Sequence, residues 1–226
     1  LIPLATHPVT DGWEWWEDDG LRPLMEQIGE QVARQSLRIS SHLPELCVLS
    51  TADEQTFQWT EKYLAYHRRL FEAMGLDEKA KIIMHLGGAY GDKQAALEQA
   101  VHRISELSPW VRERLCLEND DKVFSAAEVL EVCRRTRTTM VFDYHHHRCR
   151  NDGEDFHDLL PAVFATWTDR PPKIHLSSPR QWPPDSPPGA DGEPKVDRAH
   201  ADYVDIDFVR PVIEAARRLG DFDIMV

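Results

Sequence analysis

The sequence predicts an α/β fold of the TIM (β/α)8 barrel type, incomplete at both ends of this chain. Two observations favour this fold. Six short apolar runs alternate with segments whose apolar residues recur at helical spacing, and a His, Asp or Glu lies at or near the end of most of these runs. Such alternation is typical of parallel βαβ units. Neither the glycine-rich dinucleotide fingerprint nor the phosphate-loop motif occurs, so a nucleotide-binding sheet lacks its usual signals.

The expected strands are the apolar runs at 37–41, 82–86, 114–118, 138–142, 173–176 and 222–226. The expected helices, defined by helical spacing of apolar residues, are 22–36, 54–75, 92–107, 125–136, 155–165 and 207–219. Residues 178–197 are rich in proline, and we expect them to form a long loop on the active-site face. Residues 1–226 are therefore expected to form a single, partial barrel domain.

The composition is that of an ordinary globular protein and excludes several classes. The 226 residues are 42% hydrophobic and 29% charged, with a formal net charge of −13. No apolar run approaches the roughly 18–20 residues that a membrane span needs, so no membrane partner is expected. A basic, non-specific nucleic-acid binder is disfavoured, because such binding comes from clustered Lys and Arg. The four cysteines are widely spaced and are expected to be reduced thiols in a cytoplasmic protein.

Metal-binding residue types recur at the ends of the apolar runs, separated by 25 to 43 residues, which is close to one βα unit. They are His7, His42, His85, Glu118, Asp143 and His175. In a parallel barrel these positions meet at the C-terminal mouth of the strands. Imidazole and carboxylate ligands together suit Zn²⁺, Mn²⁺ or Fe²⁺ better than Ca²⁺. The pattern therefore predicts a metal site.

A run of three histidines follows Asp143 and offers further ligands. Asp143 and His146 lie three residues apart and are expected to face two different ions. Glu118 is the expected bridge between two ions, as in two-metal hydrolases. A solvated loop is the expectation for at least one of residues 145–147.

Four motifs together resemble the UV damage endonuclease family. They are residues 1–8 (LIPLATHP), 85–91 (HLGGAYG), 117–120 (LEND) and 173–178 (KIHLSS). The resemblance covers essentially the whole chain in order. It implies a TIM barrel related to endonuclease IV, with two to three divalent ions, usually manganese, although Zn²⁺ or Fe²⁺ would also suit the ligands.

Carried over by residue, the resemblance implies three metal groups. These are His42, His85 and Glu118; Glu118, Asp143 and His175; and His146 with His200. His7 and Lys173 fall on positions that orient phosphate, water or metal, so that Glu118, His7 and Lys173 are the expected catalytic residues.

Candidate contacts to DNA come partly from the resemblance and partly from residue type. Glu45 and Leu46 lie close to where the family usually has a Gln-aromatic pair that probes the lesion, and apolar side chains can wedge between bases. The other candidates are Trp13, which follows the first apolar run, and Tyr90 in the glycine motif. Arg148 and Arg150, beside the histidine run, complete the set.

The implied reaction is hydrolysis of the backbone of double-stranded DNA on the 5′ side of UV photoproducts and similar lesions, which starts excision repair. Bound cations would offset part of the acidic charge at the site. We expect a monomer. The alternatives are an abasic-site endonuclease or a xylose-isomerase-like sugar isomerase on the same barrel, or a truncated barrel that binds metal or DNA without cutting.

Overall fold

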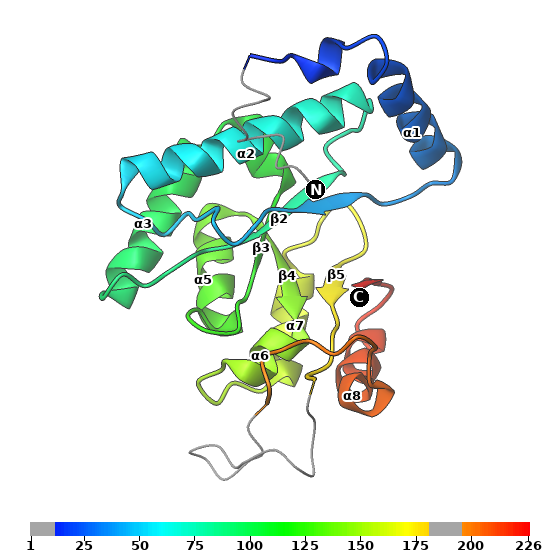
Figure 1. Cartoon of the computed structure of the whole chain (residues 1–226). Helices are drawn as coiled ribbons and strands as arrows, with labels where there is room; N and C mark the ends of the chain where they lie inside the picture. Colours follow the sequence, from blue (N-terminus) through cyan, green and yellow to red (C-terminus); the bar gives the residue numbers. More distant parts are fainter. Residues whose placement is uncertain (1–11, 181–195) are drawn as a thin grey trace. The chain divides into compact units, whose positions relative to one another are not determined.

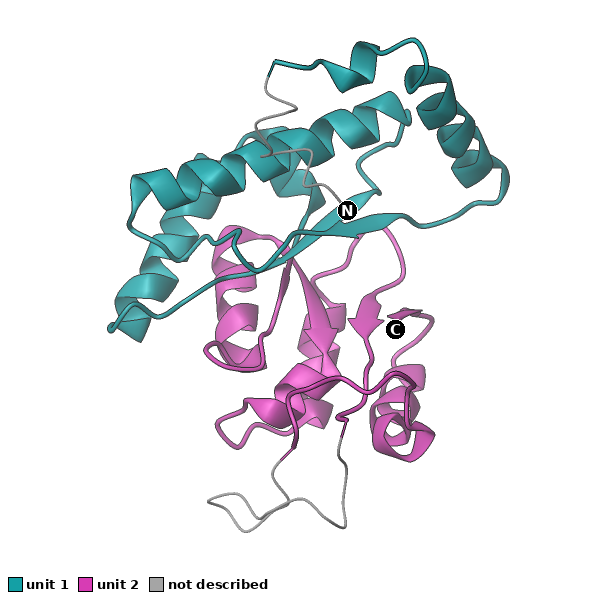
Figure 2. Cartoon of the chain, in the orientation of Figure 1, with its two compact units in different colours: residues 1–116 teal, residues 117–226 magenta. Residues whose placement is uncertain are grey.

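The computed structural model describes residues 12–180 and 196–226. Figure 1 shows short strands that alternate with helices along the chain. The chain divides into two compact units, Leu1–Cys116 and Leu117–Val226 (Figure 2). No helix in the described ranges is both long enough and apolar enough to cross a membrane.

The elements follow one another in an alternating order. The strands are β1 (Ser40–His42), β2 (Lys81–His85), β3 (Leu115–Glu118), β4 (Thr139–Asp143), β5 (Lys173–His175) and β6 (Asp223–Met225). The helices are the 3₁₀ helix η2 (Trp15–Glu17), α1 (Arg22–Arg34), α2 (Glu54–Ala73), α3 (Lys93–Glu106), α4 (Pro109–Arg114), α5 (Ala126–Thr136), α6 (Tyr144–Cys149), α7 (Phe156–Phe164) and α8 (Ile206–Arg217).

The first unit contains the neighbouring strands β1 and β2, and β3 spans the boundary between the two units. β1 and β2 are parallel, with His42 opposite Ile83. The first four residues of β2 are all buried, which is typical of a parallel strand covered on both faces. Helix α2 buries Phe57, Leu64 and Phe71, whose seven-residue spacing places them on one face of the helix.

In the second unit the order is β3-β4-β5-β6, and β4, β5 and β6 pair in parallel. Asp143 at the end of β4 lies opposite His175 at the end of β5. Because parallel neighbours end at the same edge of a sheet, this register brings the two side chains to one edge.

The α/β prediction is confirmed, and each expected strand overlaps an observed one. β1 begins at Ser40 rather than at residue 37. Leu37 is 49% exposed, and it follows Ser36, whose φ of 52° is incompatible with an extended chain. Most of residues 178–197 lies outside the described residues. The single-domain organisation stays a prediction.

The expectation of a solvated loop within residues 145–147 was wrong. These residues lie in helix α6, which begins because the carboxylate of Asp143 accepts a hydrogen bond from the backbone N–H of His146 at 2.8 Å. His145 and His147 are 0% and 2% exposed. A polar run therefore forms a buried turn of helix at the end of β4. Helix α4 was not predicted either, although Ser108 and Pro109 form an ordinary helix start.

Helix α5 offers a test of the fold at the loop that follows β3. Ser125 and Glu128 form a capping box, with Glu128 accepting from the Ser125 N–H at 2.8 Å, and the Ser125 hydroxyl also donates to Glu154 at 2.7 Å. We expect Ser125→Ala to lower the free energy of unfolding by about 1–2 kcal/mol, measured by urea denaturation. The exposed Ser105→Ala in α3 is the control and should stay within about 0.5 kcal/mol of the parent. Equal losses in the two variants would contradict the cap.

Candidate metal centre

Two buried carboxylates lie at the ends of neighbouring strands in the second unit. Glu118 ends β3 and Asp143 ends β4, and they are 2% and 4% exposed. His146 of α6 lies between them, with Nδ1 3.6 Å from Glu118 Oε1 and 3.8 Å from Asp143 Oδ2. One ligand atom from each of the three residues lies within 4.8 Å of the others. Buried carboxylates are costly unless cations or hydrogen bonds compensate them, so this group has the composition and spacing of a cation site.

β5 supplies a second histidine to the same carboxylate. His175 Nδ1 lies 3.0 Å from Glu118 Oε1. Lys173 lies two residues earlier on the strand and is buried. Because side chains alternate between the faces of a strand, Lys173 and His175 are on the same face of β5.

The pKa shifts of Asp143 and His146 both reflect the negative charge of the two carboxylates. Burial is the main cause that raises the pKa of Asp143, and the charge of Glu118 adds to it, although His146 opposes the shift. Burial alone would lower the pKa of His146, but Asp143 and Glu118 together raise it above its ordinary value. Both shifts favour bound protons next to the carboxylates. A divalent cation can replace such protons, since metal binding and deprotonation are linked.

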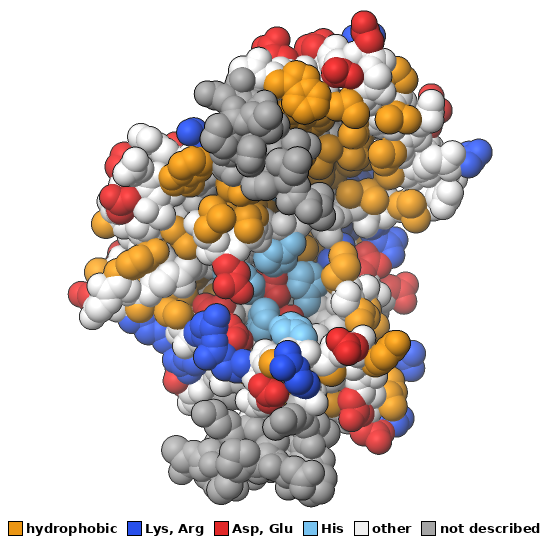
Figure 3. All heavy atoms as spheres, viewed as in Figure 1, with side chains coloured by type: hydrophobic (Ala, Val, Ile, Leu, Met, Phe, Trp, Pro, Cys, Tyr) orange, Lys and Arg blue, Asp and Glu red, His pale blue; other side chains and the backbone are white. Residues whose placement is uncertain are grey.

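Two further histidines lie close to His146. His145 is fully buried, with its ring nitrogens 3.0 Å from Ser177 Oγ and 2.8 Å from the Asp197 carbonyl oxygen, so its hydrogen bonds are structural. His200 is exposed, and its ring centroid lies 5.8 Å from that of His146. The structure thus brings together the His146 and His200 pair that the family resemblance implies. Histidine side chains reach the surface on the face of the molecule drawn in Figure 3.

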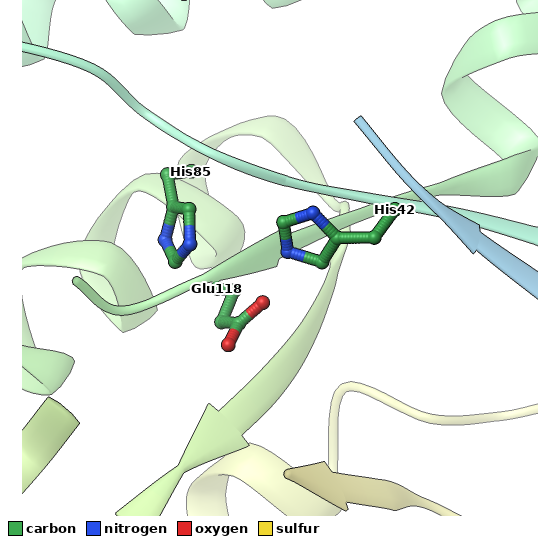
Figure 4. A group of neighbouring side chains, drawn as sticks. All are labelled: His42, His85 and Glu118. Atoms are coloured by element: carbon green, nitrogen blue, oxygen red, sulfur yellow. The ribbon is translucent and has the colours of Figure 1, made fainter. Parts of the chain in front are cut away.

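In the first unit, His42 and His85 end the parallel strands β1 and β2. Their ring centroids lie 5.3 Å apart at an interplanar angle of 56°. His42 Nδ1 lies 2.7 Å from the Leu43 carbonyl oxygen, and an N–H···O bond there leaves Nε2 with its lone pair. Figure 4 draws both rings and labels Glu118 of β3 as well. Nearby His67 has its pKa lowered to about 4, by burial and then by His42.

The predicted DNA-contacting residues of the first unit are all exposed. Leu46 is 53%, Tyr90 62% and Trp13 41% exposed, and Glu45 is also exposed. Tyr90 has a φ of 50°, an unusual conformation for a bulky residue, and one that clusters at functional sites.

The two glycines that precede Tyr90 in the motif lie in crowded surroundings. Gly87 has a φ of 114°, and a Cβ there would lie 2.7 Å from the side chain of Val48. A Cβ at Gly88 would lie 3.3 Å from the Tyr90 ring. Glycine is therefore required at position 87, and position 88 leaves room for the ring.

The arginines near α6 have partners within the second unit. Arg150 makes two hydrogen bonds to the Asp152 carboxylate, at 2.7 and 2.9 Å. Arg148 donates to the Tyr144 hydroxyl at 3.3 Å and lies over the Phe208 ring. Their contact with DNA stays a prediction, as do the other site roles. His7 lies outside the described residues.

One residue of the site was not recognised from the sequence. Asn119 follows Glu118 and is fully buried, and its amide bonds to both the N–H and the carbonyl of Asp143, at 3.0 and 2.9 Å. Its place in the LEND motif at 117–120 was the signal available.

Comparison with known proteins identifies the family of the chain. The family model "UvdE: UV-endonuclease UvdE" matches residues 1–226. The chain is 36% identical over 232 residues to a UV DNA damage endonuclease of Bacillus thuringiensis subsp. konkukian (strain 97-27), covering 100% of this chain and 68% of that protein.

Solved structures agree on the fold. The crystal structure of SacUVDE superimposes with a TM-score of 0.80 at 31% identity, over 99% of this chain and 70% of that one. A xylose isomerase-like TIM barrel/4-hydroxyphenylpyruvate dioxygenase fusion protein matches with a TM-score of 0.54 at 12% identity, over 89% of this chain and 32% of that one, which is a likeness of fold alone. The predicted TIM-barrel type of α/β fold is thereby confirmed, and the chain belongs to the UV-endonuclease UvdE family.

Proposed function

We propose that this chain is a metal-dependent endonuclease that hydrolyses double-stranded DNA on the 5′ side of UV photoproducts and similar lesions, and so starts excision repair. Its family membership and its relatives, which are UV DNA damage endonucleases, support a nuclease over a sugar isomerase. The observation that carries the metal-dependent mechanism is the buried group of Glu118, Asp143 and His146.

The donor set fits divalent transition metals. Two carboxylates and two imidazoles, those of His146 and His175, suit Mn²⁺, Zn²⁺ or Fe²⁺, and we propose Mn²⁺ first, in two to three sites. Bound ions would supply a nucleophile from water at neutral pH and stabilise the charge that develops on the leaving oxygen. The chain then needs no side-chain nucleophile for the cut.

We assign the ligands to three groups, two of which share Glu118. Glu118, Asp143 and His175 form one group, and His146 with His200 forms another, supported by the 5.8 Å between their rings. His42 and His85 complete the third group with Glu118. Support within the first unit is that His42 and His85 end the neighbouring parallel strands β1 and β2, with their ring centroids 5.3 Å apart.

The remaining roles follow from position. Lys173 shares a face of β5 with His175, which suits a lysine that orients phosphate or water. Tyr90 and Leu46 are exposed apolar side chains on loops that follow β2 and β1, and they suit contact with unstacked bases. The acidic net charge of −13 is compatible with a DNA substrate when cations neutralise the buried carboxylates.

Removal of the central carboxylate tests the proposed site. We expect Glu118→Gln to lower the rate of nicking of irradiated plasmid by at least about 100-fold, because even partners of metal ligands contribute about 10–100-fold. Glu131→Gln, at an exposed position of α5, is the matched control and should retain full activity. A Glu118→Gln protein that nicks at the parent rate would contradict the assignment.

Removal of metal tests the cofactor. We expect a chelator to abolish nicking of irradiated plasmid, because the carboxylates cannot activate water without cations, and added Mn²⁺ to restore it. The measurement is conversion of supercoiled to open-circular DNA. Undiminished nicking by protein shown to be metal-free would sink the metal-dependent mechanism.

The exposed tyrosine of the glycine motif tests the DNA contact. Tyr90→Ala should weaken binding to lesion-containing duplex by about 10–100-fold, since one base stacked on an aromatic ring contributes roughly 1–3 kcal/mol. Fluorescence anisotropy measures the affinity. Tyr203→Ala removes a tyrosine that is 88% exposed and lies outside the proposed site, so it should bind as the parent does. Equal affinities for all three proteins would remove Tyr90 from the interface.

A further inference from the structure

Asn119 connects the end of β3 to the end of β4 through its side chain. Its Oδ1 accepts the backbone N–H of Asp143 at 3.0 Å, and its Nδ2 donates to the backbone carbonyl of the same residue at 2.9 Å. The amide can do both because its oxygen accepts and its nitrogen donates from the same carbon atom. Asn119 is 0% exposed, so water does not substitute for these bonds.

The backbone of Asn119 contacts the second ligand of the same group. His146 Nδ1 lies 2.9 Å from the Asn119 carbonyl oxygen, closer than it lies to either Glu118 or Asp143. A hydrogen bond from Nδ1 to this oxygen would leave Nε2 as the ring nitrogen with the lone pair that a metal could bind. One residue thus contacts both Asp143 and His146.

The opposite end of β4 has a similar arrangement without any ligand. The backbone N–H of Met140 donates to Thr166 Oγ1 at 3.0 Å, and its carbonyl accepts from Trp167 Nε1 at 2.7 Å. Side chains therefore hold β4 at both ends, through the two backbone groups of one residue at each end. Asp143, the carboxylate of the proposed site, lies at the Asn119 end of β4. A loss of metal binding that follows removal of the Asn119 bonds but not of the Thr166 bond would therefore be specific to the site.

We propose that Asn119 is a positioning residue that holds the Asp143 carboxylate where it can bind a divalent cation together with Glu118. This inference rests on the proposed function. The two amide bonds fix both the position and the orientation of the Asp143 backbone, and hence the origin of its side chain. Without them, Asp143 and the start of α6, which its carboxylate caps, can shift relative to Glu118.

The test compares Mn²⁺ binding by Asn119→Leu and Thr166→Val. Leucine has nearly the shape of asparagine but neither hydrogen-bonding atom, and the backbone contact with His146 is retained. Valine removes the Thr166 hydroxyl that supports the other end of β4. Asn119→Ala is a second variant that serves if the leucine does not fit. Titration calorimetry with Mn²⁺ gives the affinity, and thermal unfolding of the metal-free protein gives the structural cost.

We expect both substitutions to lower the thermal midpoint of the metal-free protein. Asn119→Leu should also weaken Mn²⁺ binding by about 10–100-fold, whereas Thr166→Val should bind Mn²⁺ as the parent does. Parent-like Mn²⁺ affinity in a folded Asn119 variant would overturn the positioning role. A parent protein that binds no Mn²⁺ would instead overturn the proposed metal-dependent function, so the two failures are distinguishable.

Discussion

Two carboxylates are buried side by side at the ends of β3 and β4, and the proposed site depends on how their negative charge is compensated. Glu118 and Asp143 are both less than 5% exposed, and two such charges destabilise a fold unless positive charge or hydrogen bonds compensate them. Without another cation, bound protons compensate: burial and the charge of Glu118 raise the pKa of Asp143, and the two carboxylates raise the pKa of His146. A divalent cation provides the same compensation at neutral pH. The unfavourable burial is thus the physical basis of the proposed catalytic centre.

Parallel pairing of very short strands positions the residues of the site. β5 contributes only three residues, and its register with β4 sets His175 opposite Asp143. The strand interiors are apolar and buried, so the ligands stand at the ends of rigid elements, as a precise site requires. Helix α6 then starts directly on the Asp143 carboxylate, which places His146 beside it. Fold and site therefore share the same few hydrogen bonds.

Much of this arrangement could be predicted from local sequence, because short apolar runs and the residues that end them are local signals. The strands carrying Glu118, Asp143 and His175 were predicted to within about two residues for that reason. Helix α6 was missed because three consecutive histidines give no apolar periodicity, and the partners of the buried His145, Ser177 and Asp197, are far away in sequence. The role of Asn119 depends on a partner 24 residues away, so its place in the LEND motif was the one local signal for it.

The central claim is that Glu118 and Asp143 bind a divalent cation, and anomalous diffraction tests it most directly. Crystals of the protein grown with Mn²⁺ would be measured at wavelengths on either side of the manganese absorption edge. We predict an anomalous peak within bonding distance of carboxylate oxygens from both Glu118 and Asp143. Well-ordered carboxylates with no peak between them, at saturating Mn²⁺, would contradict the claim.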